Sequence, residues 1–213
     1  MKATAVLPVK RFGAAKQRLA SGIGRNRRAD LVAAMLEDVL EAISGTRSIE
    51  RTIVVTSEPR AEGLALAVGA ELLPDPDEGG HSGAARAGIA RALELGATCA
   101  VLLPGDCPLL DPRELERLLT GTPERYVAIV PDRHGTGTNA LALAPPDAIE
   151  PAFGEGSCAR HVTAARQAGT PFGVEELPSL ALDLDTPADV VALTRELATR
   201  GDRAGRTARA FGI

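Results

Sequence analysis

Apolar residues along this chain alternate between short continuous runs and longer stretches with helical spacing. The run ATAVLPV at 3–9 is typical of a strand buried on both faces, and RTIVVTS at 51–57 is rich in the β-branched residues that favour strands. Between these runs, apolar residues of 30–43 recur every three to four positions, which predicts an amphipathic helix. The chain therefore begins with a strand, a helix and a second strand.

The same alternation continues to about residue 199. Further strands are expected at 70–73, 99–104, 126–130 and 138–143, with a short one within 172–184. Further helices are expected up to about 68, at 82–95, from Asp111-Pro112 onward, at 158–168 and at 187–199. This order predicts a single three-layer α/β domain, with a mostly parallel sheet of about seven strands between helices. Residues 1–200 form that domain in this interpretation, and residues 201–213, which are poor in apolar positions, form a frayed tail.

Composition narrows the class of protein. The 213 residues are 45% hydrophobic and 24% charged, which suits one large domain with a substantial core. Aromatic residues make up 2%, tryptophan is absent and the net charge is −4, so neither nucleic acid nor a membrane surface is an expected partner. Three scattered cysteines fit free thiols in a reducing compartment, and no apolar run is long enough to span a bilayer. We therefore expect a cytoplasmic protein.

An aspartate at the end of a buried strand gives the first indication of a ligand site. In LLPGDCPLLD at 102–111, Pro104 and Gly105 end an apolar run and Asp106 follows at once. Parallel sheets bind ligands beyond the carboxyl ends of their strands, so this strand would deliver Asp106 to a ligand crevice. Cys107 has no base placed by the sequence to activate it, and we interpret it as a buried bystander.

Two further aspartates occur in LDLDTPAD at 182–189. Alternate residues of an extended segment share a face, so Asp183 and Asp185 point the same way and repel each other unless a cation lies between them. Magnesium prefers oxygen ligands of this kind. Alternatively, Asp185 caps the helix that begins at Thr186-Pro187. Together with Asp106, the pair indicates a magnesium site built from two strand ends.

A long basic segment at 10–28 follows the first strand. Lysine and arginine interleaved with glycine suit a polyphosphate, because cations and exposed amides both favour anionic oxygens. The segment has neither the Walker-A pattern nor the dinucleotide-binding glycine spacing, and a solvated basic loop is the alternative interpretation. Its basic residues are Lys10, Arg11, Lys16, Arg18, Arg25, Arg27 and Arg28.

Two glycine-rich turns are candidates for a second anion site. Gly154, Gly156 and Ser157 lie just before a predicted helix, where backbone amides and the helix dipole favour an anion. The alternatives are an ordinary helix cap by Ser157 and, for GTGT at 135–138, a plain turn.

Other polar residues carry weaker indications. Asp75 and Asp77 end the third strand and either contact a nucleotide or lie in a solvated turn. His81, His134 and His161 show no metal-binding spacing.

Seven motifs, in order along nearly the whole chain, resemble one family, the guanylyltransferases of coenzyme F-420 synthesis that act on 2-phospho-L-lactate or phosphoenolpyruvate. LPGDCPLL alone is shared with many nucleotidyltransferases, whereas its combination with AKQRL, GTGTNAL and FGEGS is much more specific. The seven motifs are VLPVK at 6–10, AKQRL at 15–19, LLPDPDEGG at 72–80, LLPGDCPLL at 102–110, GTGTNAL at 135–141, FGEGS at 153–157 and LDLDTPAD at 182–189.

The resemblance implies a fold and a set of site residues. The fold is GT-A-like and similar to molybdopterin guanylyltransferases. Asp106, Asp183 and Asp185 hold magnesium by analogy with the family. Thr138, with Thr136 as its rival, joins Gly154 and Ser157 in binding phosphoenolpyruvate. Lys10, Lys16 and Asp75 are assigned to the nucleotide, and Lys16 and Arg18 to the leaving pyrophosphate. The chain departs from the family at His81-Ser82, where Leu-Asn is usual, and the resemblance favours a homodimer.

The expected reaction joins GTP to phosphoenolpyruvate and releases pyrophosphate. The acceptor's phosphate oxygen attacks the α-phosphorus in line without an enzyme nucleophile, and the carboxylate-held magnesium offsets the repulsion between the two polyanions. 2-Phospho-L-lactate and 3-phosphoglycerate are alternative acceptors, and a molybdopterin nucleotidyltransferase is an alternative enzyme. A non-catalytic nucleotide-binding protein is an alternative of another class, although binding alone does not demand three aspartates.

Overall fold

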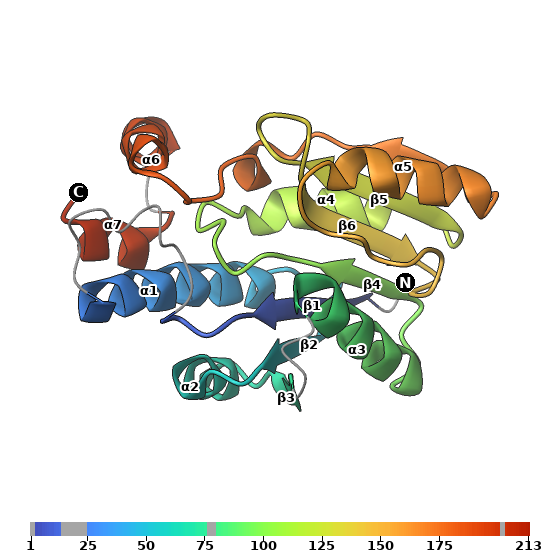
Figure 1. Cartoon of the computed structure of the whole chain (residues 1–213), viewed down its shortest axis with the longest axis horizontal. Helices are drawn as coiled ribbons and strands as arrows, with labels where there is room; N and C mark the ends of the chain where they lie inside the picture. Colours follow the sequence, from blue (N-terminus) through green and yellow to red (C-terminus); the bar gives the residue numbers. More distant parts are fainter. Residues whose placement is uncertain (1–2, 14–24, 76–79, 201–202) are drawn as a thin grey trace.

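Seven strands form one sheet in the order β3-β2-β1-β4-β6-β5-β7 (Figure 1). The computed structural model describes residues 3–13, 25–75, 80–200 and 203–213. Every pairing in the sheet is parallel except the two made by β6, so the predicted mostly parallel sheet is confirmed. The strands are β1 (Ala3–Val9), β2 (Ile49–Thr56), β3 (Glu71–Pro74), β4 (Cys99–Leu102), β5 (Tyr126–Pro131), β6 (Thr138–Ala144) and β7 (Phe172–Val174).

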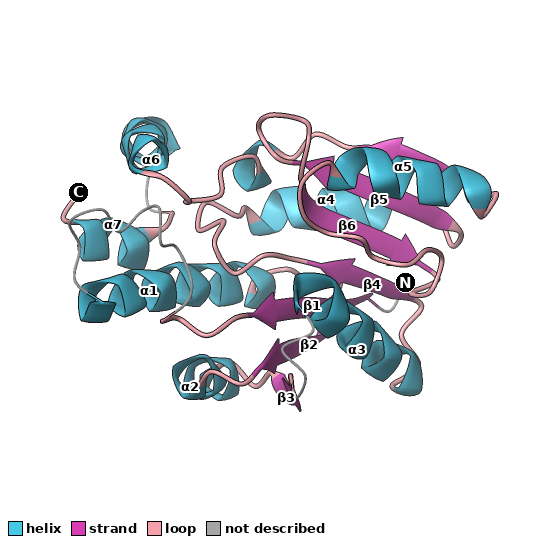
Figure 2. Cartoon of the chain, viewed as in Figure 1, coloured by secondary structure: helices cyan, strands magenta, loops and turns pink. Residues whose placement is uncertain are grey.

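Helices cover both faces of the sheet (Figure 2). Side chains of α1, α2, α4 and α6 belong to one buried cluster, and those of α3 and α5 to a second. No helix among the described residues is both long and apolar enough to cross a bilayer. The helices are α1 (Arg25–Ser44), α2 (Pro59–Ala67), α3 (Gly80–Glu94), α4 (Pro112–Gly121), α5 (Ser157–Gln167), the 3-10 turn η1 (Pro178–Leu180), α6 (Pro187–Arg200) and α7 (Gly205–Phe211).

The order in which the chain adds strands to the sheet reverses at β1, and a crevice is expected at such a point. From β1 the chain adds β2 and then β3 on one side, while β4 pairs with β1 on the other side. In α/β sheets, ligands bind where the strand order reverses, beyond the carboxyl ends of the strands. The segments that leave this point are residues 10–13 after β1 and 103–106 after β4.

The antiparallel strand β6 brings a third segment to the same edge. Leu141 pairs with Leu102 of β4, and Thr138 pairs with Pro131 at the end of β5. Because β6 runs against its neighbours, its first residue lies at the edge where β4 and β5 end. Thr138 therefore reaches the crevice from the start of a strand, while Asp106 reaches it just beyond the end of one.

The helix α3 packs unusually close to β1. A Cβ atom added to Gly88 would lie 2.2 Å from Cγ1 of Val6 and 3.3 Å from Cγ2 of Val55. Both valines are buried and β-branched, so neither can turn away easily. Glycine at this position sets the distance between α3 and the sheet, and so the position of His81 and Ser82 at the start of the helix.

Two expectations about helix boundaries are wrong. The helix α1 begins at Arg25, not near residue 30, because its first turn is too polar to show an apolar period. The expected tail includes α7, which packs on α1. The buried carboxylate of Asp38 accepts hydrogen bonds from the Thr207 amide (2.8 Å) and hydroxyl (2.7 Å), and thereby caps α7. Asp38 and Thr207 are 169 positions apart in the sequence, so no local sequence pattern predicts their contact.

Candidate active site

Two adjoining pockets occupy the crevice at the carboxyl edge of the sheet. The first, of about 320 Å³, lies over α1, and the second, of about 680 Å³, extends toward the start of α5. Both are lined by Lys10, His81, Pro104, Asp106 and Asp185. The continuous space is therefore large enough for two ligands that meet at these shared residues.

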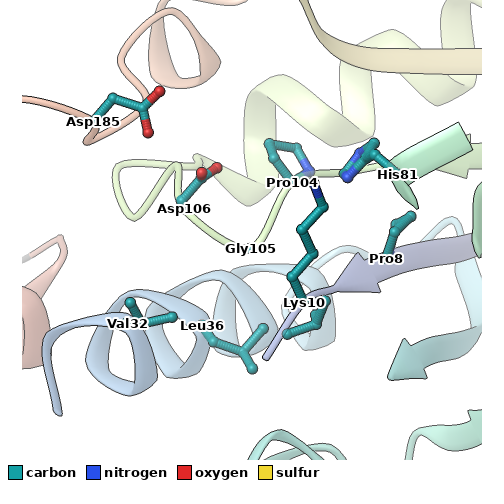
Figure 3. A pocket seen from close by; sticks show the side chains of 10 residues that line it. Pro8, Lys10, Val32, Leu36, His81, Pro104, Gly105, Asp106 and Asp185 are labelled. Carbon is teal, nitrogen blue, oxygen red and sulfur yellow. The ribbon is translucent and has the colours of Figure 1, made fainter. Parts of the chain in front are cut away.

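A backbone hydrogen bond joins the two aspartate segments. The Leu184 amide donates to the Asp106 carbonyl over 3.2 Å. Leu184 is fully buried, and as the alternation predicts, Asp183 and Asp185 on either side line the second pocket together with Asp106. In Figure 3 the carboxylates of Asp106 and Asp185 face the same space.

The start of α6 is capped by Asp189. Its Oδ2 accepts hydrogen bonds from the Asp185 amide (2.9 Å) and the Thr186 amide (2.6 Å), and Arg133 contacts its Oδ1 at 2.5 Å. Burial alone would raise the pKa of Asp189, but these hydrogen bonds and the Arg133 charge lower it. Because α6 begins at Pro187, its N-cap position is Thr186 and not Asp185, and the Asp185 side chain lines both pockets.

The donor set at the shared edge fits a hard cation. Asp106, Asp183 and Asp185 all line the second pocket, although no three acidic, histidine or cysteine side chains in the described parts of the chain stand close enough to hold a metal ion by themselves. Magnesium is commonly held by one or two carboxylates and completes its coordination shell with water and substrate phosphates. Carboxylates that are too far apart to enclose the ion by themselves are therefore compatible with a magnesium site that is completed when the substrate binds.

Lys10 and His81 form the other wall of the first pocket. Figure 3 shows the Lys10 side chain reaching from the end of β1 toward Pro104 and His81. Burial lowers the pKa of His81, nearby Asp106 opposes this change and Lys10 adds to it. Lys16 and Arg18, assigned to the leaving pyrophosphate, lie outside the described residues. Asp75 follows β3 and lines neither pocket, and its nucleotide contact stays a prediction.

The far end of the second pocket contains a buried hydrogen-bond chain. Ser157 Oγ lies 3.0 Å from Thr138 Oγ1, which lies 3.0 Å from Nδ1 of His161. The Ala152 amide donates to Nε2 of His161 over 2.9 Å. Ser157 and His161 are buried, while Thr138 and Ser157 also line the pocket. Two of the three predicted acceptor residues are thus in direct contact.

Arg160 shapes the glycine turn that precedes α5. Its guanidinium donates to the carbonyls of Ala152, Phe153 and Glu155. A peptide's carbonyl and amide point in opposite directions, so the amides of Gly154 and Gly156, which follow two of these carbonyls, point away from Arg160. Gly154 (φ +110°) and Gly156 (φ +71°) adopt backbone conformations that favour glycine.

The structure corrects the expectation that the first amides of α5 are free. The Ser157 amide donates to the Gly154 carbonyl, and the Cys158 amide donates to the Thr136 carbonyl. Ser157 does not cap the helix either, because Gly156 occupies that position and the Ser157 hydroxyl bonds to Thr138. Since these two amides are already hydrogen-bonded, the Thr138 and Ser157 hydroxyls are more important as donors to a ligand than the sequence indicates.

The rival residue Thr136 faces a different partner. Its amide donates to Oδ1 of Asp132 over 2.9 Å, and its side chain is exposed on the turn before β6. Thr138 is instead in contact with Ser157. Although both threonines line the pocket, this contact favours Thr138 as the member of the acceptor site.

Cys107 packs inside the protein, as expected of a bystander. Its side chain is fully buried in the main apolar cluster, and Sγ lies 3.7 Å from the Leu180 carbonyl. It lines neither pocket, so no nucleophile role is supported.

Three contacts at the pocket wall were not expected from the sequence. The Phe153 ring lies edge-on to His81 (4.8 Å between centroids) and His161 (5.3 Å), and its amide donates to Ser82 Oγ. The departure His81-Ser82 therefore supports the loop that carries Gly154. The role of His161 was not predicted, because a lone histidine gives no functional signal; its place four residues, or about one helical turn, after Ser157 is the local feature that could have marked it.

Comparison with known proteins identifies the family. The sequence model of a protein family described as guanylyl transferase CofC like matches residues 3–204. The chain belongs to this guanylyltransferase family. A phosphoenolpyruvate guanylyltransferase of Conexibacter woesei is 47% identical over 97% of this chain and 94% of its own length. A 3-phospho-D-glycerate guanylyltransferase of Phenylobacterium zucineum is 40% identical over 91% and 90%.

Solved structures with the same fold are nucleotidyltransferases and a related sugar-nucleotide enzyme. A candidate nucleotide-diphospho-sugar transferase from Desulfovibrio desulfuricans G20 has a TM-score of 0.76 and 17% identity, over 94% of this guanylyltransferase and 90% of that chain. A nucleotidyl transferase from Methanothermobacter has a TM-score of 0.63 and 18% identity, over 92% and 98%. These neighbours confirm the expected nucleotidyltransferase fold.

Proposed function

We propose that this guanylyltransferase joins GTP to phosphoenolpyruvate and releases pyrophosphate. The observation that carries the proposal is the pair of adjoining pockets that share Lys10, Asp106 and Asp185. The first pocket would take the nucleotide, and the second ends in hydroxyls and a glycine turn suited to a small phosphate. The relatives named phosphoenolpyruvate guanylyltransferase, at 47% and 42% identity, support this acceptor.

The bond changes need no group on the enzyme to act as nucleophile. An oxygen of the acceptor's phosphate attacks the α-phosphorus of GTP, a new phosphoanhydride forms, and the bond to the β-phosphate breaks as pyrophosphate leaves. The phosphate is already ionised, so no proton must be removed. Thr138, Ser157 and the Gly154 turn would orient the acceptor, and Lys10 would lie beside the nucleotide phosphates.

Asp106, Asp183 and Asp185 are the residues that would hold magnesium, whose charge would offset the repulsion between the reacting phosphates. Lys16 and Arg18 would stabilise the leaving pyrophosphate, on the strength of their place in the AKQRL motif.

A second candidate acceptor is 3-phospho-D-glycerate. It is supported by the Phenylobacterium zucineum relative, which carries that substrate in its name. The three phosphorylated acids, including 2-phospho-L-lactate, share the carboxylate and phosphate that such a pocket would bind.

The test is release of pyrophosphate from GTP and magnesium in the presence of each acid. We expect the highest kcat/KM with phosphoenolpyruvate, and a product in which the acid's phosphate is linked to guanosine monophosphate. Pyruvate, which lacks the attacking phosphate, is the matched control and should give no pyrophosphate. No release with any phosphorylated acid would overturn the proposal, and a higher kcat/KM for 3-phospho-D-glycerate would reassign the acceptor.

A further inference from the structure

The buried histidine beside the proposed acceptor site has a fixed pattern of hydrogen bonding. The Ala152 amide can only donate, so Nε2 of His161 must accept and carries no proton. Burial lowers the pKa of His161 to about 4, with a further contribution from Arg160, so the ring is neutral near pH 7. A neutral ring without a proton on Nε2 carries it on Nδ1, which donates to Thr138 Oγ1.

This tautomer decides how many hydroxyl protons are left for the pocket. Thr138 and Ser157 have one hydroxyl proton each, and one of the two is used in the hydrogen bond between them. Because His161 donates into the pair, the second hydroxyl proton has no internal acceptor within this chain of three side chains and is available to a ligand. The result is the same whichever hydroxyl donates to the other.

The opposite tautomer would reverse the character of this wall. If Nδ1 carried no proton, Thr138 would donate to it and Ser157 would donate to Thr138. Both hydroxyl protons would then be consumed, and only oxygen lone pairs would face the pocket. Such a wall repels a phosphate or carboxylate oxygen, whereas a wall with a proton to donate attracts it.

We propose that His161 is a positioning residue that makes the Thr138–Ser157 pair a hydrogen-bond donor to the acceptor's anionic oxygen. The inference rests on the proposed function, because it places the acceptor acid in the second pocket. His161 itself is fully buried and acts through Thr138, without touching the substrate. The Ala152 amide, held on the loop that Arg160 organises, supplies the constraint on the tautomer.

Two substitutions of nearly equal size differ in what they offer at the Nδ1 position. In His161→Asn, the side-chain amide can take the place of Nδ1 and donate to Thr138. In His161→Asp, a carboxylate oxygen takes the same place and can only accept, so Thr138 donates to it, Ser157 donates to Thr138, and both hydroxyl protons are consumed. Both variants lose the partner of the Ala152 amide, so simple structural damage predicts similar defects, whereas the proposal predicts different ones.

Steady-state kinetics of the full chain, with GTP and phosphoenolpyruvate varied separately, measure the difference. We expect His161→Asp to raise the KM for the acid about 10- to 100-fold, the range for a lost hydrogen bond to a charged group, with the KM for GTP nearly unchanged. His161→Asn should stay within about threefold of the wild type for both substrates. His134→Asp, the same change at an exposed histidine that lines neither pocket, is the matched control and should leave both KM values unchanged. Equal KM values for the acid in the Asn and Asp variants would overturn the proposal.

Nitrogen-15 NMR of the histidine rings gives a readout that does not need activity. The free protein should show His161 with its proton on Nδ1 at pH 7. A proton on Nε2 would overturn the inference even in an active enzyme. The protein could instead show the Nδ1–H form and yet release no pyrophosphate with any acid. In that case the tautomer would be correct, but the proposed function would be wrong, and so would the role of His161 toward the acceptor.

Discussion

The two ends of the crevice prepare for their ligands in different ways. At the shared edge, Lys10, Asp106 and Asp185 bring opposite charges to the pocket on segments that leave β1, β4 and η1. At the far end, neutral hydroxyls are held by a buried histidine and a glycine turn. The shared edge depends on charge, which acts over several ångströms, and its arrangement is completed only when a ligand binds. The far end depends on directed hydrogen bonds that are already formed in the free protein. Changes at the two ends should therefore affect different kinetic constants.

The largest effect is expected at the charged end. Asp106→Ala should lower kcat about 100-fold, or about 3 kcal/mol, because one of the three carboxylates that would hold magnesium beside the reacting phosphates is lost. The loss should appear with every acceptor acid. Asp147→Ala, at an exposed aspartate that lines neither pocket, is the control in the same pyrophosphate assay. Normal turnover by a folded Asp106→Ala protein would remove the distinction between the two ends.

The next effect concerns stability at the neutral end. The pKa of His161 is about 4 in the folded protein and 6.5 for an ordinary histidine, so the unfolded chain binds more protons between these values. Stability from the neutral ring is fully present above pH 6.5 and is lost as the pH falls toward 4. This one group should lower the free energy of unfolding by about 2 kcal/mol between pH 7 and pH 5.

Urea denaturation at the two pH values measures this loss. The His161→Asn variant lacks the titrating ring and should show a correspondingly smaller change between pH 7 and pH 5. If the wild type and the variant lose the same stability, the buried neutral histidine makes no such contribution.

A smaller effect should follow from loosening the glycine turn. Arg160→Ala removes the donors to three carbonyls of residues 152–155 and should raise the KM for the acid about 5- to 10-fold while the KM for GTP changes little. Arg166→Ala on the exposed side of the same helix is the control. An increase in the KM for GTP as large as that for the acid would mean that the two ends are not independent.

The smallest effect is expected at Cys107. Because this thiol is buried away from both pockets, Cys107→Ser should change kcat by less than about tenfold. A dead Cys107→Ser enzyme beside an active Asp106→Ala enzyme would show that the assignment of the chemistry is reversed. Both variants should be compared at equal folded concentration.

The sequence by itself determined the elements and the charged end of the site. Apolar runs such as 3–9 predict buried strands because solvent exclusion acts on each residue locally, and a helical period predicts α1 for the same reason. The place of Asp106 after a strand and the alternation of Asp183 and Asp185 with buried leucines are also local, so their arrival at one pocket edge was predictable once the sheet was known to be mostly parallel.

Only the tertiary structure decided the neutral end and the C-terminal helix. The antiparallel direction of β6 brings Thr138 to the crevice, and the contacts of His161 with Thr138 and Ala152 fix its tautomer. In the same way, Asp38 caps α7 from a distant part of the chain. The physical reason is shared by all three: a polar group's partner depends on which segments pack together, and neither hydrophobic period nor residue type encodes that choice locally.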